Sequence, residues 1–254
     1  MPLHAATVAA STADEQAKLA EQLNNPVAAL ISVPLQSNWD FGIGPKDAYK
    51  YTLKIQPVVP ITLNADWNVI SRTILPVIDA ESPATGIDSA SGLGDTTQSF
   101  FFSPKEPTAG GLIWGVGPAF LLPTASDDLL GNNQWGAGPT VVALKQKDGW
   151  TYGMLANQIW SFGASDEQVS ALFVQPFVSY TTKMHTTFSL NTESTYDWEN
   201  RELSAPINLA VAQLVKIGEV PVQFQLGGRW YADGPDGGPE WGLRFAITFL
   251  FPKS

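Results

Sequence analysis

The chain has 254 residues, and its 14 Lys and Arg against 24 Asp and Glu give a formal net charge of −10. Only 15% of the residues are charged, against roughly 25% in an average soluble domain, whereas 44% are hydrophobic. The acidic balance argues against a nucleic-acid partner, which requires clustered Lys and Arg. With no Cys, disulfides, cysteine-zinc sites and thiol nucleophiles are excluded.

Residues 1–26 are predicted to form an N-terminal arm with one short helix, from Ala13 to about Leu23. Thr12 and Glu15 have capping-box spacing, and the segment that follows is rich in helix formers. The apolar face of this helix is weak, so two interpretations stay open: a solvated arm, or a plug or lid. The opening MPLHAATVAAS is compatible with the remnant of a cleaved export signal.

Beyond Pro26 the hydrophobic pattern has a period of two, which is typical of strands with one apolar and one polar face. No stretch favours a helix that spans a membrane, because the longest charge-free run (107–126) is interrupted by Pro and Gly. About twelve alternating segments can be counted, an even number, as bacterial outer-membrane barrels have. They begin near Ala28, Ala48, Thr62, Gly92, Gly111, Gln134, Gly149, Val169, Thr186, Leu203, Val220 and Glu240.

The connections alternate in length, which is a second sign of such a barrel. Those after even-numbered segments are mostly short (59–61, 147–149, 183–185 and 216–219), whereas several after odd-numbered segments are long and acidic (76–92, 123–133, 162–168 and 232–240). Outer-membrane barrels have short periplasmic turns and longer outer loops. Both termini are therefore expected in the periplasm, and several Trp residues near segment ends suit interfacial girdles.

We predict an all-β fold: an antiparallel transmembrane β-barrel formed by residues 27–254. A soluble sandwich or lipocalin-like barrel would give the same alternation. With this many long strands, however, it would have to fill a wide polar interior or expose a large apolar face. The expected surroundings are outer-membrane lipid and lipopolysaccharide, and the expected state is a monomer.

If the apolar faces contact lipid, the polar faces line the lumen. Both signs of charge occur among the predicted lumen residues, which suits either an internal ladder of paired charges or a selective pore. Inward glycines at 115, 117, 136 and 138 leave room for a plug, a kinked strand or a ligand, or only relieve curvature. The predicted lumen-lining residues are Lys54, Gln56, Asn64, Asp66, Arg72, Asn191, Glu193, Asp197, Asn208, Gln223, Gln225, Arg229, Tyr231 and Arg244.

The middle of the chain carries GLGD at 92–95, a repeated WGxGP element at 114–118 and 135–139, and NQIWSF at 157–162. In these motifs the sequence resembles the Gram-negative outer-membrane family labelled phenol meta-pathway degradation or transporter proteins. The resemblance extends over most of the chain after Asn25. It implies an outer-membrane barrel associated with small, often aromatic or hydrophobic compounds, and it brings no catalytic or ligand residues with it.

The sequence offers little catalytic chemistry. Of its two histidines, His185 lies in a predicted short turn, and His185-Thr186-Thr187 lacks the Ser of the His-x-Ser pair that some twelve-stranded phospholipases use. His and carboxylate clusters at metal-ligand spacing are absent, and no cofactor is expected. We therefore expect a passive channel for small hydrophobic or aromatic compounds. A lipid hydrolase and a closed structural barrel that binds partners through its loops are the alternatives.

Overall fold

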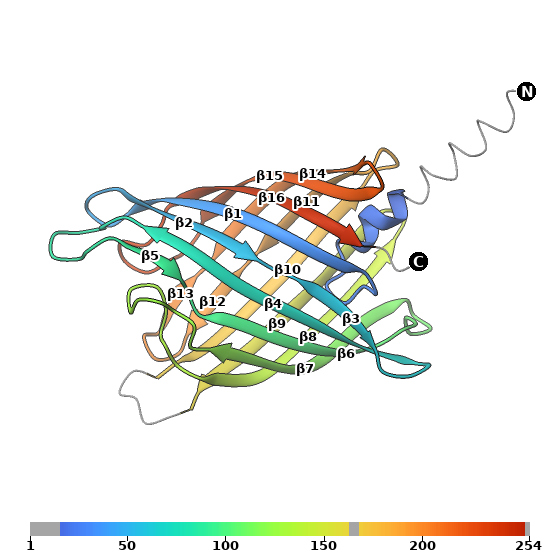
Figure 1. Cartoon of the computed structure of the whole chain (residues 1–254), viewed down its shortest axis with the longest axis horizontal. Coiled ribbons are helices and arrows are strands. Elements are labelled where there is room, and N and C mark those ends of the chain that lie inside the picture. The colour runs from blue at the N-terminus through green and yellow to red at the C-terminus, as the bar shows by residue number, and fades with distance from the viewer. Residues whose placement is uncertain (1–15, 163–167, 252–254) are drawn as a thin grey trace, which may run out of the picture.

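The computed structural model describes residues 16–162 and 168–251, and within them the chain forms a closed antiparallel β-barrel (Figure 1). Its segments are β1 (Ile31–Ile43), β2 (Ala48–Ile55), β3 (Val58–Thr62), β4 (Trp67–Ala80), β5 (Ala90–Leu93), β6 (Thr96–Pro104), β7 (Leu112–Leu122), β8 (Gly136–Lys147), β9 (Trp150–Ser161), β10 (Ser170–Thr181), β11 (Thr186–Thr192), β12 (Ser194–Asp197), β13 (Glu202–Ser204), β14 (Pro206–Ile217), β15 (Val220–Tyr231) and β16 (Trp241–Phe251).

These segments make twelve barrel strands, as the sequence predicts. Four strands are interrupted and consist of two segments each: β2 with β3, β5 with β6, β11 with β12, and β13 with β14. Each strand pairs with its neighbours in the sequence, and β16 closes the ring on β1 through a ladder that runs from Ile31↔Phe251 to Phe41↔Trp241. The largest error in the predicted starts is at the third strand, expected near Thr62 and observed at Trp67.

The alternation of side chains explains why this sequence forms a barrel with an apolar exterior. In β16, Trp241, Leu243 and Phe245 are exposed on the outer face, whereas Arg244 and Ala246 are buried on the inner one. Successive strand residues point to opposite faces, so each strand offers one surface to lipid and one to the interior. Among the described residues, no helix has the length and hydrophobicity needed to cross a membrane.

Aromatic pairs lie near both ends of the barrel. On the outer surface, one group of aromatic rings lies close to the short turns, and another lies close to the long loops at the opposite end. This arrangement matches the two interfacial girdles of membrane barrels. The pairs are Trp67–Trp114 and Trp150–Tyr180 at the turn end, and Phe41–Trp241, Trp39–Tyr51 and Tyr196–Trp198 at the loop end.

Two of the expected connections are wrong. Residues 59–61 lie inside β3, where Pro60 pairs with Ile70 of β4, and the turn follows at residues 63–66. This is possible because β3 pairs with β1 at one position only, so a proline there interrupts no long ladder. The expected loop 76–92 is shorter, because β4 continues to Ala80 and pairs with β5 from Ala90.

The repeated WGxGP element places two prolines side by side in the wall. Pro118 of β7 is paired with Pro139 of β8. The β6–β7 ladder lacks pairs at Phe100 and Phe101, and the β8–β9 ladder lacks them at residues 138 and 139. A proline has no N–H to donate, so each one opens the ladder on its other side.

Candidate functional site in the barrel interior

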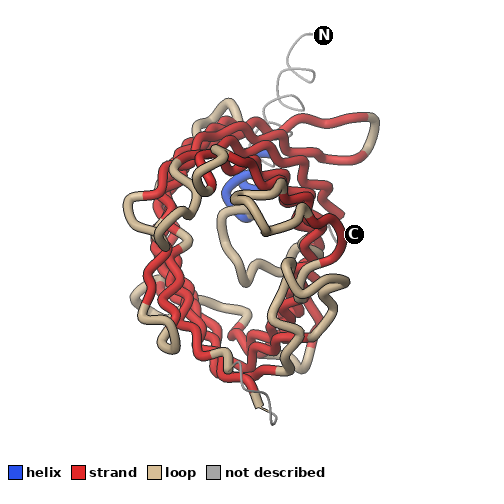
Figure 2. Tube along the Cα trace, turned by 90° about the vertical axis from the view of Figure 1, so that its left-hand side faces the viewer, coloured by secondary structure: helices blue, strands red, loops and turns tan. Residues whose placement is uncertain are grey.

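The N-terminal residues described by the structure lie inside the barrel at the end where β1 begins (Figure 2). We call residues 16–30 the inner segment; residues 16–22 of it are helical. Ala20 is fully buried and packs with Leu30, Leu214 and Leu250, while Leu23 lies against the same cluster. The apolar side of the predicted helix therefore faces the barrel wall, and the predicted part from 13 to 15 lies outside the described residues.

Polar contacts anchor the inner segment to two further strands. The Gln146 side-chain amide of β8 donates to the carbonyl oxygen of Glu21 at 2.7 Å. The Asn24 side-chain amide donates to the Thr181 hydroxyl of β10 at 3.1 Å. Together with the apolar contacts on β14 and β16, these bonds attach the segment to opposite parts of the wall.

The end of the inner segment is held by an apolar wall. Val27 is 6% exposed and belongs to one cluster with Ile70, Phe101, Val142, Leu144 and Leu155. Gly115 makes room for it, since a Cβ there would lie 3.2 Å from Val27 Cγ1. The prediction that polar faces line the lumen is therefore wrong for this side, where β4, β6, β8 and β9 present hydrophobic residues that Val27 covers. The inner segment continues to Leu30, and β1 begins at Ile31.

The opposite side of the interior carries a group of paired charges, here called the lumen charge cluster: Asp40, Lys54, Glu193, Arg229 and Arg244. Glu193 lies in the break between β11 and β12 and accepts two hydrogen bonds from Arg244 of β16, at 2.8 and 3.0 Å. Two strands, β14 and β15, separate them. The residues level with Arg244 on these strands are small, since Gly227 pairs with Arg244 and Ala210 pairs with Gly227.

The other members of the cluster contact the carboxylates of Asp40 and Glu193. Arg229 Nη1 is 3.0 and 3.1 Å from the two oxygens of Asp40, and both side chains are more than nine-tenths buried. The Arg229 guanidinium also lies 5.3 Å from the centre of the Tyr231 ring. Lys54 Nζ is more distant, 3.7 Å from Glu193 Oε2. Bidentate and buried pairing of this kind is strong and geometrically specific.

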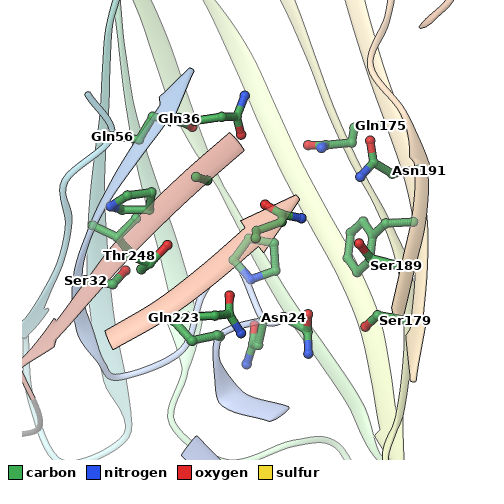
Figure 3. Close-up of a pocket in the computed structure, with 18 of the residues that line it drawn as sticks. Asn24, Ser32, Gln36, Gln56, Gln175, Ser179, Ser189, Asn191, Gln223 and Thr248 are labelled. Atoms are coloured by element: carbon green, nitrogen blue, oxygen red, sulfur yellow. The ribbon is translucent and has the colours of Figure 1, made fainter. Parts of the chain in front are cut away.

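A cavity of about 310 Å³ lies between the inner segment and the lumen charge cluster. Gln36 and Gln56 project into it from one wall, Gln175, Ser189 and Asn191 from the other, and Asn24 from the inner segment (Figure 3). Its other lining residues include Lys54, Arg72, Glu193 and Arg244, together with Phe173 and Phe177. This volume is at the lower end of the range for small-molecule sites.

Comparison with known proteins agrees with this architecture. No protein-family model and no curated protein matches the chain. Among solved structures, it is similar to an outer membrane channel from Pseudomonas putida F1, with a TM-score of 0.67 and 15% identity over 88% of this chain and 96% of that one. At this identity the likeness establishes the fold: this is an outer-membrane-type β-barrel.

Two further structures superpose less well. The beta domain of the Bordetella autotransporter BrkA has a TM-score of 0.49 and 8% identity, over 88% of this chain and 100% of that one. The outer membrane phospholipase A from Escherichia coli has a TM-score of 0.48 and 10% identity, over 89% of this chain and 91% of that one.

Most of the residues expected in the lumen come together around the cavity or the lumen charge cluster. Asn191 accepts a hydrogen bond from Asn208, which is buried next to it. The residues that line the cavity directly are Lys54, Gln56, Arg72, Asn191, Glu193, Gln223, Gln225 and Arg244. Arg229 and Tyr231 belong to the neighbouring charge cluster.

Three of the expected residues lie neither at the cavity nor at the lumen charge cluster. Asn64 and Asp66 are exposed in the turn that follows β3, where the Asn64 side-chain oxygen accepts from the backbone N–H of Asp66 and Trp67. The carboxylate of Asp197 caps the turn after β12 by accepting from the backbone of Glu199 and Asn200. Asn and Asp favour such local bonds at turns. Asn64 and Asp66 therefore lie outside the strand to which alternation assigned them, whereas Asp197 is the last residue of β12 and bonds to the turn that follows.

Asn38 and Asp40 also face the interior but are not among the predicted lumen residues. Their alternation with Leu35, Trp39 and Phe41 in β1 is the signal in the sequence that indicates an inward face. Asn38 is fully buried and its oxygen accepts from Arg244 Nε at 2.8 Å. The motif residue Asp95 has a structural role instead. Its carboxylate accepts from the backbone N–H groups of Ala125, Asn132 and Asn133, which holds the loop between β7 and β8.

His185 lies in the turn between β10 and β11, with a φ of 63°. That is the end of the barrel where the inner segment enters, as the sequence predicts for a turn residue. Within residues 16–162 and 168–251, no group of three or more His, Asp or Glu residues is placed to hold a metal ion.

Proposed function

We propose that this protein is a passive channel of the Gram-negative outer membrane for small hydrophobic or aromatic compounds. The observation that carries the proposal is the combination of an apolar, aromatic-ringed exterior with a polar and charged cavity inside a closed barrel. A barrel of this kind is stable in a lipid bilayer and keeps a water-accessible interior. The motifs shared with the phenol meta-pathway family favour aromatic solutes.

The inner segment would then act as the plug of this channel. It enters with the short turns, so both termini are proposed to lie in the periplasm, where a partner could reach the residues before it. Its contacts with Leu214, Leu250, Gln146 and Thr181 of the wall, and the packing of its own Val27 against the apolar side of the interior, fix it across the lumen. Solute flux would accordingly depend on whether this segment stays docked.

Conductance of the purified chain in a planar bilayer tests the channel directly. We expect discrete openings and uptake of phenol into liposomes that contain the protein. A variant without residues 1–25 should conduct more, because the docked helix is gone. Absence of conductance together with absence of uptake of phenols or alkanes, by protein that is folded in the membrane, would refute the channel.

Two other functions make different predictions. A lipid hydrolase would release fatty acid from outer-membrane phospholipid, and a closed structural barrel would pass no solute with or without the inner segment. The His185 position at the turn end does not favour the hydrolase, whose substrate would lie in the outer leaflet. Phospholipase assay of the same liposomes separates these functions from transport.

A further inference from the structure

The cavity between the inner segment and the lumen charge cluster has two chemically different walls. One wall carries Lys54 of β2, Arg72 of β4, and Gln56, which lies in the break between β2 and β3. The other carries the rings of Phe173 and Phe177 of β10, with Gln175 between them and with Ser189 and Asn191 of β11 beside them. A solute that satisfies both walls at once must have a polar end and an apolar body.

The charges on the polar wall are not balanced. Asp40 is already engaged by Arg229, and both oxygens of Glu193 accept from Arg244. Lys54 Nζ lies at 3.7 Å from Glu193, which is too long for a good hydrogen bond. Two carboxylates thus stand against three cations in the lumen charge cluster, and Arg72 adds a fourth cation beside them.

Arg72 has unused hydrogen-bonding capacity. Its Nη2 donates to Gln56 Oε1 at 3.2 Å, and it makes no ion pair with any residue that the structure describes. A guanidinium has five N–H donors and an ammonium has three. Arg72 and Lys54 therefore offer donors and positive charge to an anion in the cavity.

The apolar surface of the two phenylalanines suits a ring. Phe173 and Phe177 are partly buried and pack against the cluster that holds Val27, and Val58 lies with them. Aromatic side chains prefer aromatic partners in offset or edge-to-face contact. A volume of about 310 Å³ admits a solute with a single ring.

We propose that this cavity binds small aromatic carboxylates of the benzoate type. The carboxylate binds to Lys54 and Arg72, and the ring packs against Phe173 and Phe177. This inference rests on the proposed function, because it names the class of solute that the channel admits. It also makes a claim of its own: the site discriminates by charge between rings of the same size.

Equilibrium dialysis of radiolabelled benzoate against the detergent-solubilised full-length chain tests the site without requiring transport. Benzyl alcohol and benzylamine, added as competitors, have the same ring without the negative charge. We expect benzoate to bind and each competitor to displace it at least about tenfold less well than unlabelled benzoate, the loss expected without a charge-assisted hydrogen bond.

The decisive variant is the double substitution K54Q and R72Q. It leaves Asp40 and Glu193 with their Arg partners, so the barrel should keep its heat-dependent shift on electrophoresis. Benzoate affinity should fall at least about tenfold, since two charge-assisted contacts are lost. Lys54→Arg should retain binding because the charge remains, and Lys183→Gln, in the exposed turn after β10, is the matched control and should bind like the wild type.

Equal binding of the three ring compounds, or unchanged benzoate affinity in the folded double variant, would overturn the inference. Conductance recorded from the same preparations separates failure of this inference from failure of the proposed function. Conductance without benzoate binding would refute the binding site and leave the channel standing. Benzoate binding without conductance would refute the channel and leave the binding site standing.

Discussion

Pro118 of β7 and Pro139 of β8 face each other in the wall, and each follows a glycine onto which a neighbouring carbonyl folds. An ideal Cβ on Gly117 would lie 1.9 Å from the Phe100 oxygen, and one on Gly138 would lie 1.7 Å from the Gln158 oxygen. Both carbonyls stand opposite the prolines, which have no N–H to offer. Only a glycine lets these carbonyls approach so closely, so the glycine of each repeated Gly-Pro element is required by the packing of the wall.

Gly138→Ala should therefore destabilise the barrel by about 2 kcal/mol, since the added methyl meets backbone that cannot move freely. Gly228→Ala is the matched control in another strand, because nothing lies within 4 Å of a Cβ there. Urea midpoints of the two variants in detergent provide the comparison. Equal midpoints would show that the carbonyl can move aside.

Glu193→Gln should weaken the fold because Glu193 is the common partner of Arg244 and Lys54. Removal of one member of a buried ion pair typically costs about 3–5 kcal/mol, and here it leaves the buried Arg244 short of its carboxylate. Glu219→Gln removes an exposed ion pair with Lys216 and should change little. The temperature at which each variant loses its compact form on electrophoresis reports the difference; similar temperatures would contradict a stabilising role of the lumen charge cluster.

Val27→Asp should release the inner segment, because a carboxylate would enter the cluster around Phe101 and Leu144 without a partner. Ala29→Asp, two residues further and exposed, should leave it docked. Hydrogen exchange of residues 16–30 should quicken in the first variant only, and its conductance should rise. Protection that is the same in both would mean that the segment is held elsewhere.

Acidification should tighten the docking of the inner segment. Burial and, second, the nearby Asp148 raise the pKa of Glu21 above its usual 4.5. An acid whose pKa is raised by docking opposes docking while ionised, and this penalty disappears as the pH falls through the raised value. Conductance should decrease as the pH falls through this raised pKa, and Glu21→Gln should conduct weakly at every pH. If the conductance of the wild type and that of the variant change with pH in the same way, Glu21 is not the group that controls docking.

The sequence predicts the barrel well because its information is periodic. Trp241 to Phe251 alternate strictly, and such alternation over twelve segments defines strand number and inward face. The same rule fails at Asn64 and Asp66, which alternate with Leu63 and Ala65 but bond within their own turn. Local side-chain bonds there prevail over the pattern.

The apolar side of the interior could not be predicted in this way. Ile70 and Leu144 look like lipid-facing residues in the sequence, since nothing nearby indicates that Val27 will cover them. Pairs such as Glu193 with Arg244 are likewise invisible, because their 51-residue separation is bridged only through the pairing of the strands between them. Long-range contacts of this kind depend on curvature and register, which a one-dimensional pattern does not contain.

The strand β1 begins at Ile31, directly after Leu30 of the inner segment. The segment is thus a ligand of its own barrel, tied to it without a linker. An intramolecular ligand on a short tether acts at an effective concentration in the millimolar range or above. Reclosure after release would be unimolecular and independent of how much protein the membrane holds, whereas a free peptide of residues 16–30 would need a comparable concentration to replace it.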